Sequence, residues 1–292
     1  MGEVAAAVYP FVPSVSLDTL WFQVAGTLCN LKCTHCFISC SPTNHSHGML
    51  TLEQVRERLA EAAKLGVQEY YFTGGEPFLN PEMLPILEAA LAQGPASVLT
   101  NGLPLTPERC RRLKELSDAS EYSLEIRISI DGYAAETNDP IRGAGTFRKI
   151  LDGIQNLSDA GLNPVITVTE ACGEAASEEG RARFLDWMRE IGLAKPRLKI
   201  LSLFRIGAEE RRLRAYQSWE TLRGRSLTAE ESEKLQCSSC RMVTSKGVYV
   251  CPILIEEPLA RMGETLAETL RPFELAHASC FTCHEYGVTC RT

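Results

Sequence analysis

The pattern of apolar and polar positions along the chain predicts a repeated strand and helix unit. Short apolar segments typical of buried strands lie at 20–24, 70–72, 97–99, 124–130, 165–168 and 198–203. Amphipathic stretches separate them, and their expected starts or spans are Thr51-Leu52-Glu53-Gln54 (a capping box), Asn80-Pro81, Thr106-Pro107-Glu108, Phe147 to Ala160, and 184–188. Strands that alternate with helices predict a parallel α/β sheet.

The number of these units predicts an incomplete barrel. Six βα repeats fall short of the eight that close a (β/α)8 barrel, so we expect a partial (β/α)6 TIM-like barrel, open on one side for a large substrate or partner domain. The chain of 292 residues also has room for a small appendage. The predicted organisation is an N-terminal extension at 1–19, the barrel at 20–207, a helical linker at 208–236 and a small C-terminal cysteine-rich domain at 237–292.

Composition narrows the class of partner and the compartment. The chain is 45% hydrophobic and 23% charged, enough to bury a substantial core. Its net charge of -7 argues against a nucleic-acid partner. The apolar stretch from Val4 to Pro13 follows Glu3 and contains Pro10, which predicts neither a signal peptide nor a membrane span. Twelve cysteines without an export signal indicate metal binding and a cytoplasmic location.

Three of these cysteines form the most informative motif, Cys29-x-x-x-Cys33-x-x-Cys36. A short loop with this spacing can give thiolates to three irons of a 4Fe-4S cube, and the fourth iron is then left without a protein ligand. A metal site with one open position is built to bind something reactive. The alternative is a zinc knuckle, with one of His35, His45 or His47 as the fourth ligand.

A second motif at residues 69–77 favours the iron-sulfur interpretation. It reads Glu-Tyr-Tyr-Phe-Thr-Gly-Gly-Glu-Pro, an aromatic strand that ends in Gly74-Gly75. Glycines let the backbone approach a ligand closely, and ligands bind at the carboxyl edge of a parallel sheet. On its own, the glycine pair would be an ordinary turn.

Together the two motifs resemble the radical S-adenosylmethionine (radical SAM) superfamily. Its members carry C-x-x-x-C-x-Φ-C after the first strand, with residue Φ, here His35, beside the adenine. They carry Gly-Gly-Glu-Pro after the second strand, where the backbone receives the methionine amino group; here this is Gly74, Gly75, Glu76 and Pro77. The subgroup with extra clusters has S-x-D-G and a following arginine, matched by Ser129-Ile130-Asp131-Gly132 and by Asp139, Arg142, Gly143, Gly145 and Phe147.

The resemblance covers residues 20–207 and implies a reaction. In this family, S-adenosylmethionine chelates the open iron, and one electron delivered through the cluster breaks a carbon-sulfur bond to give methionine and a 5′-deoxyadenosyl radical. The protein then has to orient the radical against one carbon-hydrogen bond and exclude water. This requirement fits the lack of an obvious acid-base signature in the sequence.

The resemblance also suggests cofactor contacts at the strand ends. Thr100 and Asn101 are candidates, although a turn with Asn in the αL conformation is the alternative. Ser129 and Asp131 could bond the ribose or carboxylate. Arg142 could pair with the carboxylate or, alternatively, with Asp139 at the surface. Phe37 could shield the cluster, stack with adenine or belong to the core.

The last fifth of the chain contains a second group of cysteines: Cys237, Cys240, Cys251, Cys280, Cys283 and Cys290. Between them, 247–252 is typical of a β-hairpin. The arrangement resembles the SPASM domain or its shorter form, twitch, which hold auxiliary 4Fe-4S clusters. The full SPASM pattern has seven or more cysteines, so we expect at least one auxiliary cluster that draws four thiolates from these six. A structural zinc is the alternative.

Three cysteines fall outside both groups. Cys40 and Cys172 are candidates to donate a hydrogen atom to a substrate radical, and Cys110 is expected to pack in the core. His45 and His47 are expected in a polar loop, where a substrate contact is an alternative.

The sequence therefore predicts a radical SAM enzyme of the oxidoreductase or maturase type, with a peptide or protein side chain as substrate. The alternatives are an enzyme of small-molecule or cofactor biosynthesis and a non-catalytic iron-sulfur electron carrier. We expect an electron donor such as flavodoxin or ferredoxin. Residues 1–19 leave no room for a leader-binding domain, so a separate peptide-carrier protein is a further candidate partner. No nucleic-acid or membrane partner is expected.

Overall fold

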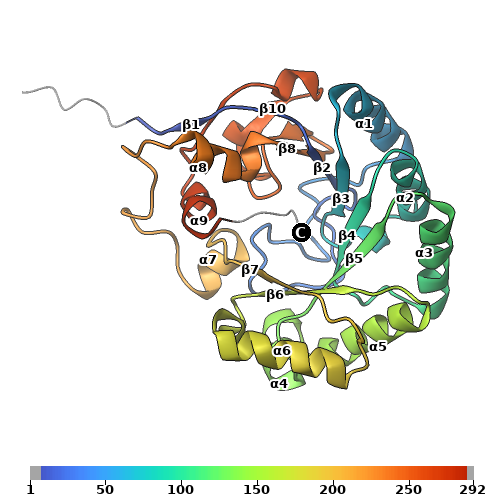
Figure 1. Ribbon diagram of the computed structural model, residues 1–292. Coiled ribbons are helices and arrows are strands. Elements are labelled where there is room, and N and C mark those ends of the chain that lie inside the picture. Colours follow the sequence, from blue (N-terminus) through green and yellow to red (C-terminus); the bar gives the residue numbers. More distant parts are fainter. Residues whose placement is uncertain (1–7, 288–292) are drawn as a thin grey trace, which may run out of the picture.

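The computed structural model describes residues 8–287 and contains the predicted parallel sheet. Its strands are β2 (Thr19–Gln23), β3 (Glu69–Thr73), β4 (Ala96–Thr100), β5 (Leu124–Ser129), β6 (Val165–Thr169) and β7 (Leu198–Leu201). They pair in chain order and all in parallel. Figure 1 shows them as a curved sheet with helices on its outer side. The expected partial barrel is confirmed.

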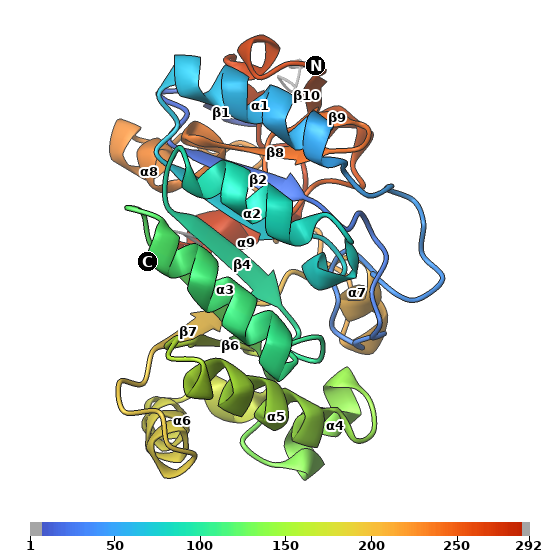
Figure 2. The same cartoon turned by 90° about the vertical axis from the view of Figure 1, so that its right-hand side faces the viewer.

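Helices cover the outer face of this sheet, as Figure 2 shows for the first of them. They are α1 (Leu52–Leu65), α2 (Met83–Leu91), α3 (Pro107–Ala119), α4 (Ala135–Arg142), α5 (Thr146–Asp159) and α6 (Glu178–Glu190), with short 3-10 turns η1 (Pro77–Leu79) and η2 (Gly173–Ala176). The predicted capping box at Thr51 and the N-cap at Thr106 are both present. α2 begins at Met83, three residues after the predicted Asn80, because η1 comes first and the Asn80 side chain is used elsewhere.

The two faces of the strands have different partners. Leu20 and Phe22 of β2 belong to the main core, which also contains the buried residues of the helices. Trp21 points the other way, because side chains alternate along a strand, and it stacks on Tyr71 with ring centroids 4.5 Å apart. Side chains on the inner face of the barrel therefore belong to a second hydrophobic cluster. This cluster also contains cysteines of both cysteine groups, such as Cys29 and Cys251.

The C-terminal region continues the barrel sheet instead of forming a separate one. It comprises α7 (Ala208–Arg212), α8 (Ala229–Lys234), η3 (Gln236–Ser238), β8 (Cys240–Thr244), β9 (Gly247–Tyr249), η4 (Pro258–Ala260), β10 (Arg261–Gly263), η5 (Ala267–Thr269), β11 (Phe273–Glu274) and α9 (Ser279–Tyr286). β8 pairs in parallel with β2, and the predicted hairpin extends it in the order β10-β9-β8-β2.

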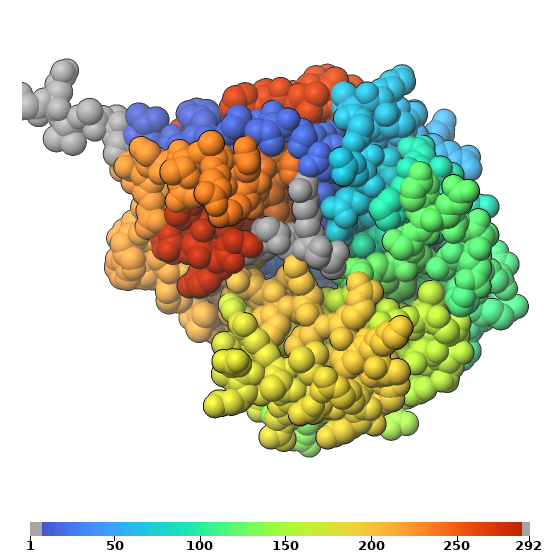
Figure 3. Space-filling model, viewed as in Figure 1, coloured from blue at the N-terminus to red at the C-terminus, as the bar shows by residue number. Residues whose placement is uncertain are grey.

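The N-terminal extension also joins this region. β1 (Phe11–Val12) pairs with β11 in a small antiparallel sheet. Figure 3 shows the blue N-terminal segment against the orange and red C-terminal residues on one side of the molecule. Of the helices in the described part of the chain, none is both long and apolar enough to cross a bilayer.

A buried asparagine closes the long loop that carries the first cysteine motif. The loop leaves the sheet after β2 and ends where α1 begins. Asn80 donates from Nδ2 to the carbonyls of Val24 and Leu50, both at 2.8 Å, and accepts from the Glu82 amide at 2.9 Å. One side chain thus holds both ends of the loop against the start of α2.

Replacement of Asn80 by alanine is expected to lower the free energy of unfolding by about 1–3 kcal/mol, because two buried carbonyls lose their donor. Urea denaturation measures this. Asn163→Ala is the matched control: its exposed side chain donates one hydrogen bond to the Lys195 carbonyl, and its loss should cost under about 0.5 kcal/mol. Equal losses in the two variants would show that Asn80 does not hold the loop.

Candidate functional site

The loop after β2 folds back on itself and gathers the first three cysteines. The Cys29 amide donates to the Ser41 carbonyl at 3.1 Å, and the Cys36 amide donates to the Cys33 carbonyl at 3.3 Å. Burial raises the pKa of Cys29 to about 12 and that of Cys33 to about 11, and nearby thiolates add to both effects. These thiols ionise at neutral pH only beside a strong positive charge, such as that of a bound metal.

Donors already point at the sulfur atoms, as a cluster requires. The Leu31 amide donates to Cys29 Sγ at 3.4 Å, and the Cys40 amide donates to Cys36 Sγ at 3.3 Å. The pKa of Cys36 is lowered to about 6, first because the Cys40 thiol donates a hydrogen bond to its sulfur. Such N–H and S–H donors stabilise thiolate ligands and tune iron-sulfur clusters.

The spacing of the side chains does not suit a single zinc ion. Zn–S bonds of about 2.3 Å in a tetrahedron would bring sulfurs within about 3.8 Å of one another. Within residues 8–287, no three His, Cys, Asp or Glu side chains are grouped closely enough to hold one ion. His47, a candidate zinc ligand, instead contacts the Ile255 carbonyl through Nε2 at 3.1 Å. What fits an iron-sulfur cube is the donor set of the loop, three thiols, two of which already receive hydrogen bonds at sulfur from the Leu31 and Cys40 amides.

The glycine pair after β3 lies directly on the cysteine loop. The Gly75 amide donates to the Gly26 carbonyl at 2.9 Å, and the Glu76 amide donates to the Leu28 carbonyl at 3.0 Å. A Cβ on Gly75 would lie 2.0 Å from the Leu28 oxygen, and Gly74 has a φ of 147°. Only glycine permits this contact, so the turn and the loop are one unit.

The Glu76 side chain turns into the protein. Its carboxylate is fully buried and accepts from Thr100 Oγ1 at 2.8 Å and from the Asn101 amide at 2.7 Å. Burial raises its pKa to about 7, and these bonds limit the increase. Pro77 follows as the first residue of η1. The Glu76 side chain is thus bonded to the end of β4 and does not point to the side of the cysteine loop where its own amide binds Leu28.

Asn101 fastens the end of β4 to the cysteine loop. Its Nδ2 donates to Asn30 Oδ1 at 2.7 Å and lies 3.8 Å from Cys29 Sγ. The alternative of an αL asparagine is wrong, because Ser39 is the one non-glycine residue with positive φ in the described chain. The following residue, Gly102, has a φ of 81° instead.

His35, Asp131 and Arg142 form one buried network. Asp131 Oδ2 is 2.6 Å from His35 Nε2 and 2.7 Å from Arg142 Nε, and its Oδ1 accepts from Thr169 Oγ1 at 2.7 Å. Burial favours the neutral acid, but Arg142 and His35 outweigh it and hold the pKa of Asp131 well below its usual range. Both carboxylate oxygens are occupied, so a direct cofactor contact would have to displace one of these partners.

The alternative partner of Arg142 is wrong as well. Asp139 does not pair with it but accepts from the Gly145 amide at 2.6 Å and the Phe147 amide at 2.8 Å, at the start of α5. Arg142 is buried and reaches Asp131 from the last turn of α4. Ser129 ends β5 in register with Thr167.

The remaining candidates near the first motif have defined surroundings. Phe37 packs against Phe204 with ring centroids 5.8 Å apart. Cys40 is buried beside Cys36, and its thiol lies 3.9 Å from the Gly74 carbonyl. Cys172 is buried after β6 in the main core, and Cys110 is a core residue of α3, as predicted. The hydrogen-donor role of Cys40 or Cys172 stays a prediction.

Four of the C-terminal cysteines surround one cavity. Cys237, Cys251, Cys280 and Cys283 line it, together with apolar side chains that include Leu235, Val250, Ile253, Leu254, Phe273 and Leu275. Burial raises the pKa of Cys237 to about 12 and that of Cys251 to about 11, and it raises the pKa of Cys280 well above its usual value. Four thiols in an apolar cavity are a complete ligand set for a 4Fe-4S cube.

The other two cysteines of this group differ. Cys240 does not line the cavity; it begins β8, and its thiol lies 3.9 Å from the Val250 carbonyl. Cys290 lies outside the described residues.

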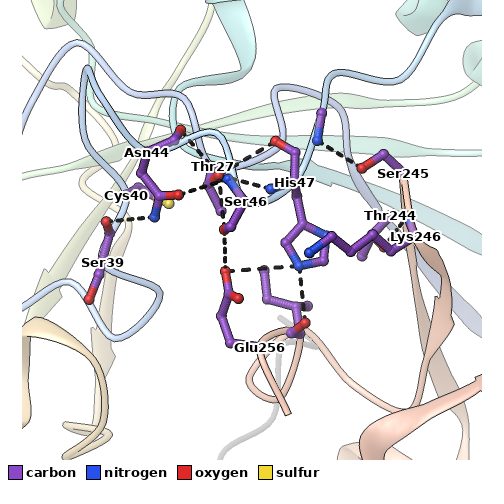
Figure 4. A network of polar contacts seen from close by, with 12 residues as sticks. Thr27, Ser39, Cys40, Asn44, Ser46, His47, Thr244, Ser245, Lys246 and Glu256 are labelled. Atoms are coloured by element: carbon purple, nitrogen blue, oxygen red, sulfur yellow. Dashed lines mark hydrogen bonds and ion pairs between the residues drawn. The ribbon is translucent and has the colours of Figure 1, made fainter. Parts of the chain in front are cut away.

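A polar network joins the first cysteine loop to the loop after Cys251 (Figure 4). Besides the contact of His47, Ser46 Oγ donates to Glu256 Oε1 at 2.7 Å. The Gly48 amide donates to Ser245 Oγ at 2.8 Å, which joins the same loop to the turn between β8 and β9. The expected polar loop is confirmed, although His47 is buried in it. A cleft of about 390 Å³ beside this network is lined by Phe37, Ile206, Leu254, Glu257 and His277, among others.

Sequence reasoning missed several polar groups on the inner face of the barrel. Trp21 Nε1, both polar atoms of the Gln23 amide and Thr167 Oγ1 are buried, and none of them has a hydrogen-bond partner among residues 8–287. Gln23 shares the face of Trp21, and Thr167 lies between Ile166 and Val168, which face the helices. A glutamine at an inward position of an apolar strand was the available signal. Unpaired buried polar groups are rare and indicate a missing ligand or water.

Sequence and fold comparisons agree with this geometry. The sequence profile of the radical SAM superfamily matches residues 24–188. The mycofactocin maturase MftC of Mycobacterium tuberculosis is 35% identical over 135 residues, which are 46% of this chain and 33% of MftC. The AdoMet-dependent heme synthase of Methanosarcina barkeri is 35% identical over 142 residues, which are 48% of this chain and 38% of the synthase. The chain thus spans about a third of the length of these relatives.

Solved structures share the fold at low sequence identity. The structure of anSMEcpe with bound AdoMet and a Cp18Cys peptide matches with a TM-score of 0.61 and 17% identity, over 86% of this chain and 79% of that one. The profile match extends over more than half of the chain and includes both the three-cysteine loop and the glycine turn. The chain therefore belongs to the radical SAM superfamily.

Proposed function

We propose that the protein is a radical SAM maturase that abstracts a hydrogen atom from a peptide or protein side chain. The observation that carries this proposal is the pairing of two cysteine sites. The loop with three thiols is in contact with the glycine turn. The polar network around His47 joins this loop to the region of the cavity with four thiols. An open site serves chemistry, and a closed site stores or passes electrons.

Different residues of the site would bind the cluster, bind the cofactor and orient the loop. Cys29, Cys33 and Cys36 would hold the first 4Fe-4S cluster, while the backbone at Gly74 and Gly75 would receive S-adenosylmethionine. When bound, this cofactor pair supplies a 5′-deoxyadenosyl radical. The buried His35 and Asp131 pair fixes the loop between its second and third cysteines to the end of β5, which orients the site.

The second cavity would hold one auxiliary 4Fe-4S cluster. Its ligands would be Cys237, Cys251, Cys280 and Cys283, with Cys240 as a neighbour and not a ligand. An electron donor such as flavodoxin or ferredoxin and a separate peptide carrier remain part of the proposal, as does a cytoplasmic location.

The inner face of the barrel supports a peptide substrate. Within the described residues, the Gln23 side chain has an unpaired N–H donor and an unpaired carbonyl acceptor, the complement of a peptide bond, and Thr167 adds a hydroxyl. The anSMEcpe structure holds a peptide, and MftC is a maturase. The heme synthase relative supports the second candidate, an enzyme that acts on a small molecule.

The protein reconstituted anaerobically with iron and sulfide is expected to release 5′-deoxyadenosine and methionine from S-adenosylmethionine when dithionite is added. Cys33→Ala should abolish the release, whereas Cys110→Ala, in a core position away from the site, should retain it. Liquid chromatography with mass spectrometry measures both products. A wild-type protein that binds iron but releases no 5′-deoxyadenosine would show an electron carrier instead.

The substrate class is tested by deuterium transfer. Candidate peptides encoded beside the gene are synthesised with deuterated side chains. The mass of the 5′-deoxyadenosine is then measured by mass spectrometry. Deuterium gained from a peptide supports a maturase. Gain only from a metabolite of neighbouring biosynthetic genes supports the second candidate.

Gln23→Leu is expected to raise the free energy of unfolding by about 1–3 kcal/mol, because it removes a buried amide that no group of residues 8–287 pairs with, and to lower peptide turnover at least tenfold. Urea denaturation and deuterium transfer measure the two effects. Gln155→Leu, at an exposed position of α5, should change both little. Full peptide turnover by Gln23→Leu would remove this residue from the substrate site.

A further inference from the structure

Arg241 is the most unusual charged residue in the structure. It follows Cys240 on β8, its side chain is fully buried, and it is among the largest side chains with no exposure. Arginine is rarely fully buried unless an opposite charge lies beside it. The position of Arg241 therefore calls for an anion.

The described residues supply it with acceptors but with no carboxylate. Nη1 donates to the carbonyls of Cys237 at 2.8 Å and Cys240 at 2.6 Å. Nε and Nη2 donate to the Thr269 carbonyl at 3.1 and 2.7 Å, and Nη2 also donates to Ser14 Oγ at 3.0 Å. No ion pair joins Arg241 to an Asp or Glu of residues 8–287. The guanidinium is thus held rigidly by five hydrogen bonds, and its charge is not neutralised by them.

Arg241 is in direct contact with the four-cysteine cavity, because Cys237, whose carbonyl accepts from Nη1, is one of the residues that line it. The sulfurs of Cys240, Cys237 and Cys251 act electrostatically on Arg241, and Cys237 and Cys251 line the cavity. A 4Fe-4S cube with four thiolates has a net negative charge in both of its common oxidation states. Such a cluster would be the missing counter-charge.

We propose that Arg241 is the built-in counter-cation of the auxiliary cluster and keeps the reduction potential of that cluster high. The inference rests on the proposed cluster at Cys237, Cys251, Cys280 and Cys283. One-electron reduction makes the cluster more negative by one charge, so a fixed cation nearby stabilises the reduced form more than the oxidised form. Arg241 touches no substrate, so it is a positioning residue that acts through charge.

Ser14 offers a way to test this without removing the arginine. Ser14→Asp places a carboxylate beside Nη2 and neutralises the guanidinium in place, while Ser14→Asn keeps an acceptor without charge. The reconstituted full-length proteins are titrated with dithionite, and each cluster is followed by electron paramagnetic resonance. Addition of S-adenosylmethionine identifies the first cluster, because only its signal should change. A Cys29→Ala, Cys33→Ala, Cys36→Ala variant shows the auxiliary signal alone.

The expected result is a more negative midpoint potential of the auxiliary cluster in Ser14→Asp and an unchanged one in Ser14→Asn, with the first cluster unmoved in both. Arg241→Gln, if it folds, should shift the midpoint potential of the auxiliary cluster in the same direction as Ser14→Asp. Arg241→Lys keeps a positive charge, so its shift should be smaller than that of Arg241→Gln. Equal auxiliary potentials in Ser14→Asp and Ser14→Asn would overturn the inference and leave Arg241 a purely structural role. A wild-type protein with iron for one cluster only would instead refute the auxiliary cluster itself, before any titration.

Discussion

Burial of cysteine sulfur is the constraint on which the rest of this structure depends. Thiols in two places are removed from water, and burial is the largest influence on the pKa of Cys29, Cys33, Cys237 and Cys251. Burial keeps these four thiols neutral at neutral pH, so they ionise there only beside a positive charge such as that of a metal group. The neighbouring donors, such as the amides of Leu31 and Cys40, then have a sulfur charge to stabilise.

The sheet brings the two sulfur sites together. β8 adds in parallel to β2, so the strand that leads into the first cysteine loop lies beside the strand that begins with Cys240. The chain between these strands forms the rest of the barrel, from α1 to β7. The loop after β2 and the loop after β9 then meet through His47 and Glu256, which contact across them. Because a shared sheet is more rigid than a linker, it fixes the distance between the two cysteine sites, and cluster chemistry needs such fixed distances.

Local patterns predicted most elements because their causes are local. The capping box at Thr51 and the glycine turn after β3 depend on residues a few positions apart, and β5 ends one residue before the predicted boundary at Ile130. The start of α2 was predicted too early, because Asn80 serves a contact with Val24 that no local pattern contains. The sequence offered the cofactor carboxylate or nearby Asp139 as the partner of Arg142, and the pair with Asp131, which comes from another element, was not predicted.

The sequence by itself determined the chemistry. It contains the spacing of Cys29, Cys33 and Cys36, the glycine pair, and the order of strands and helices. Each of these features depends on residues that are close together in the chain. Only the tertiary structure decided which four C-terminal cysteines share a cavity, and that, among the described residues, Gln23 has no hydrogen-bond partner and Arg241 has no carboxylate partner. The reason is that desolvation and charge pairing belong to the packed assembly, where segments more than two hundred residues apart, such as those of Ser14 and Arg241, come into contact.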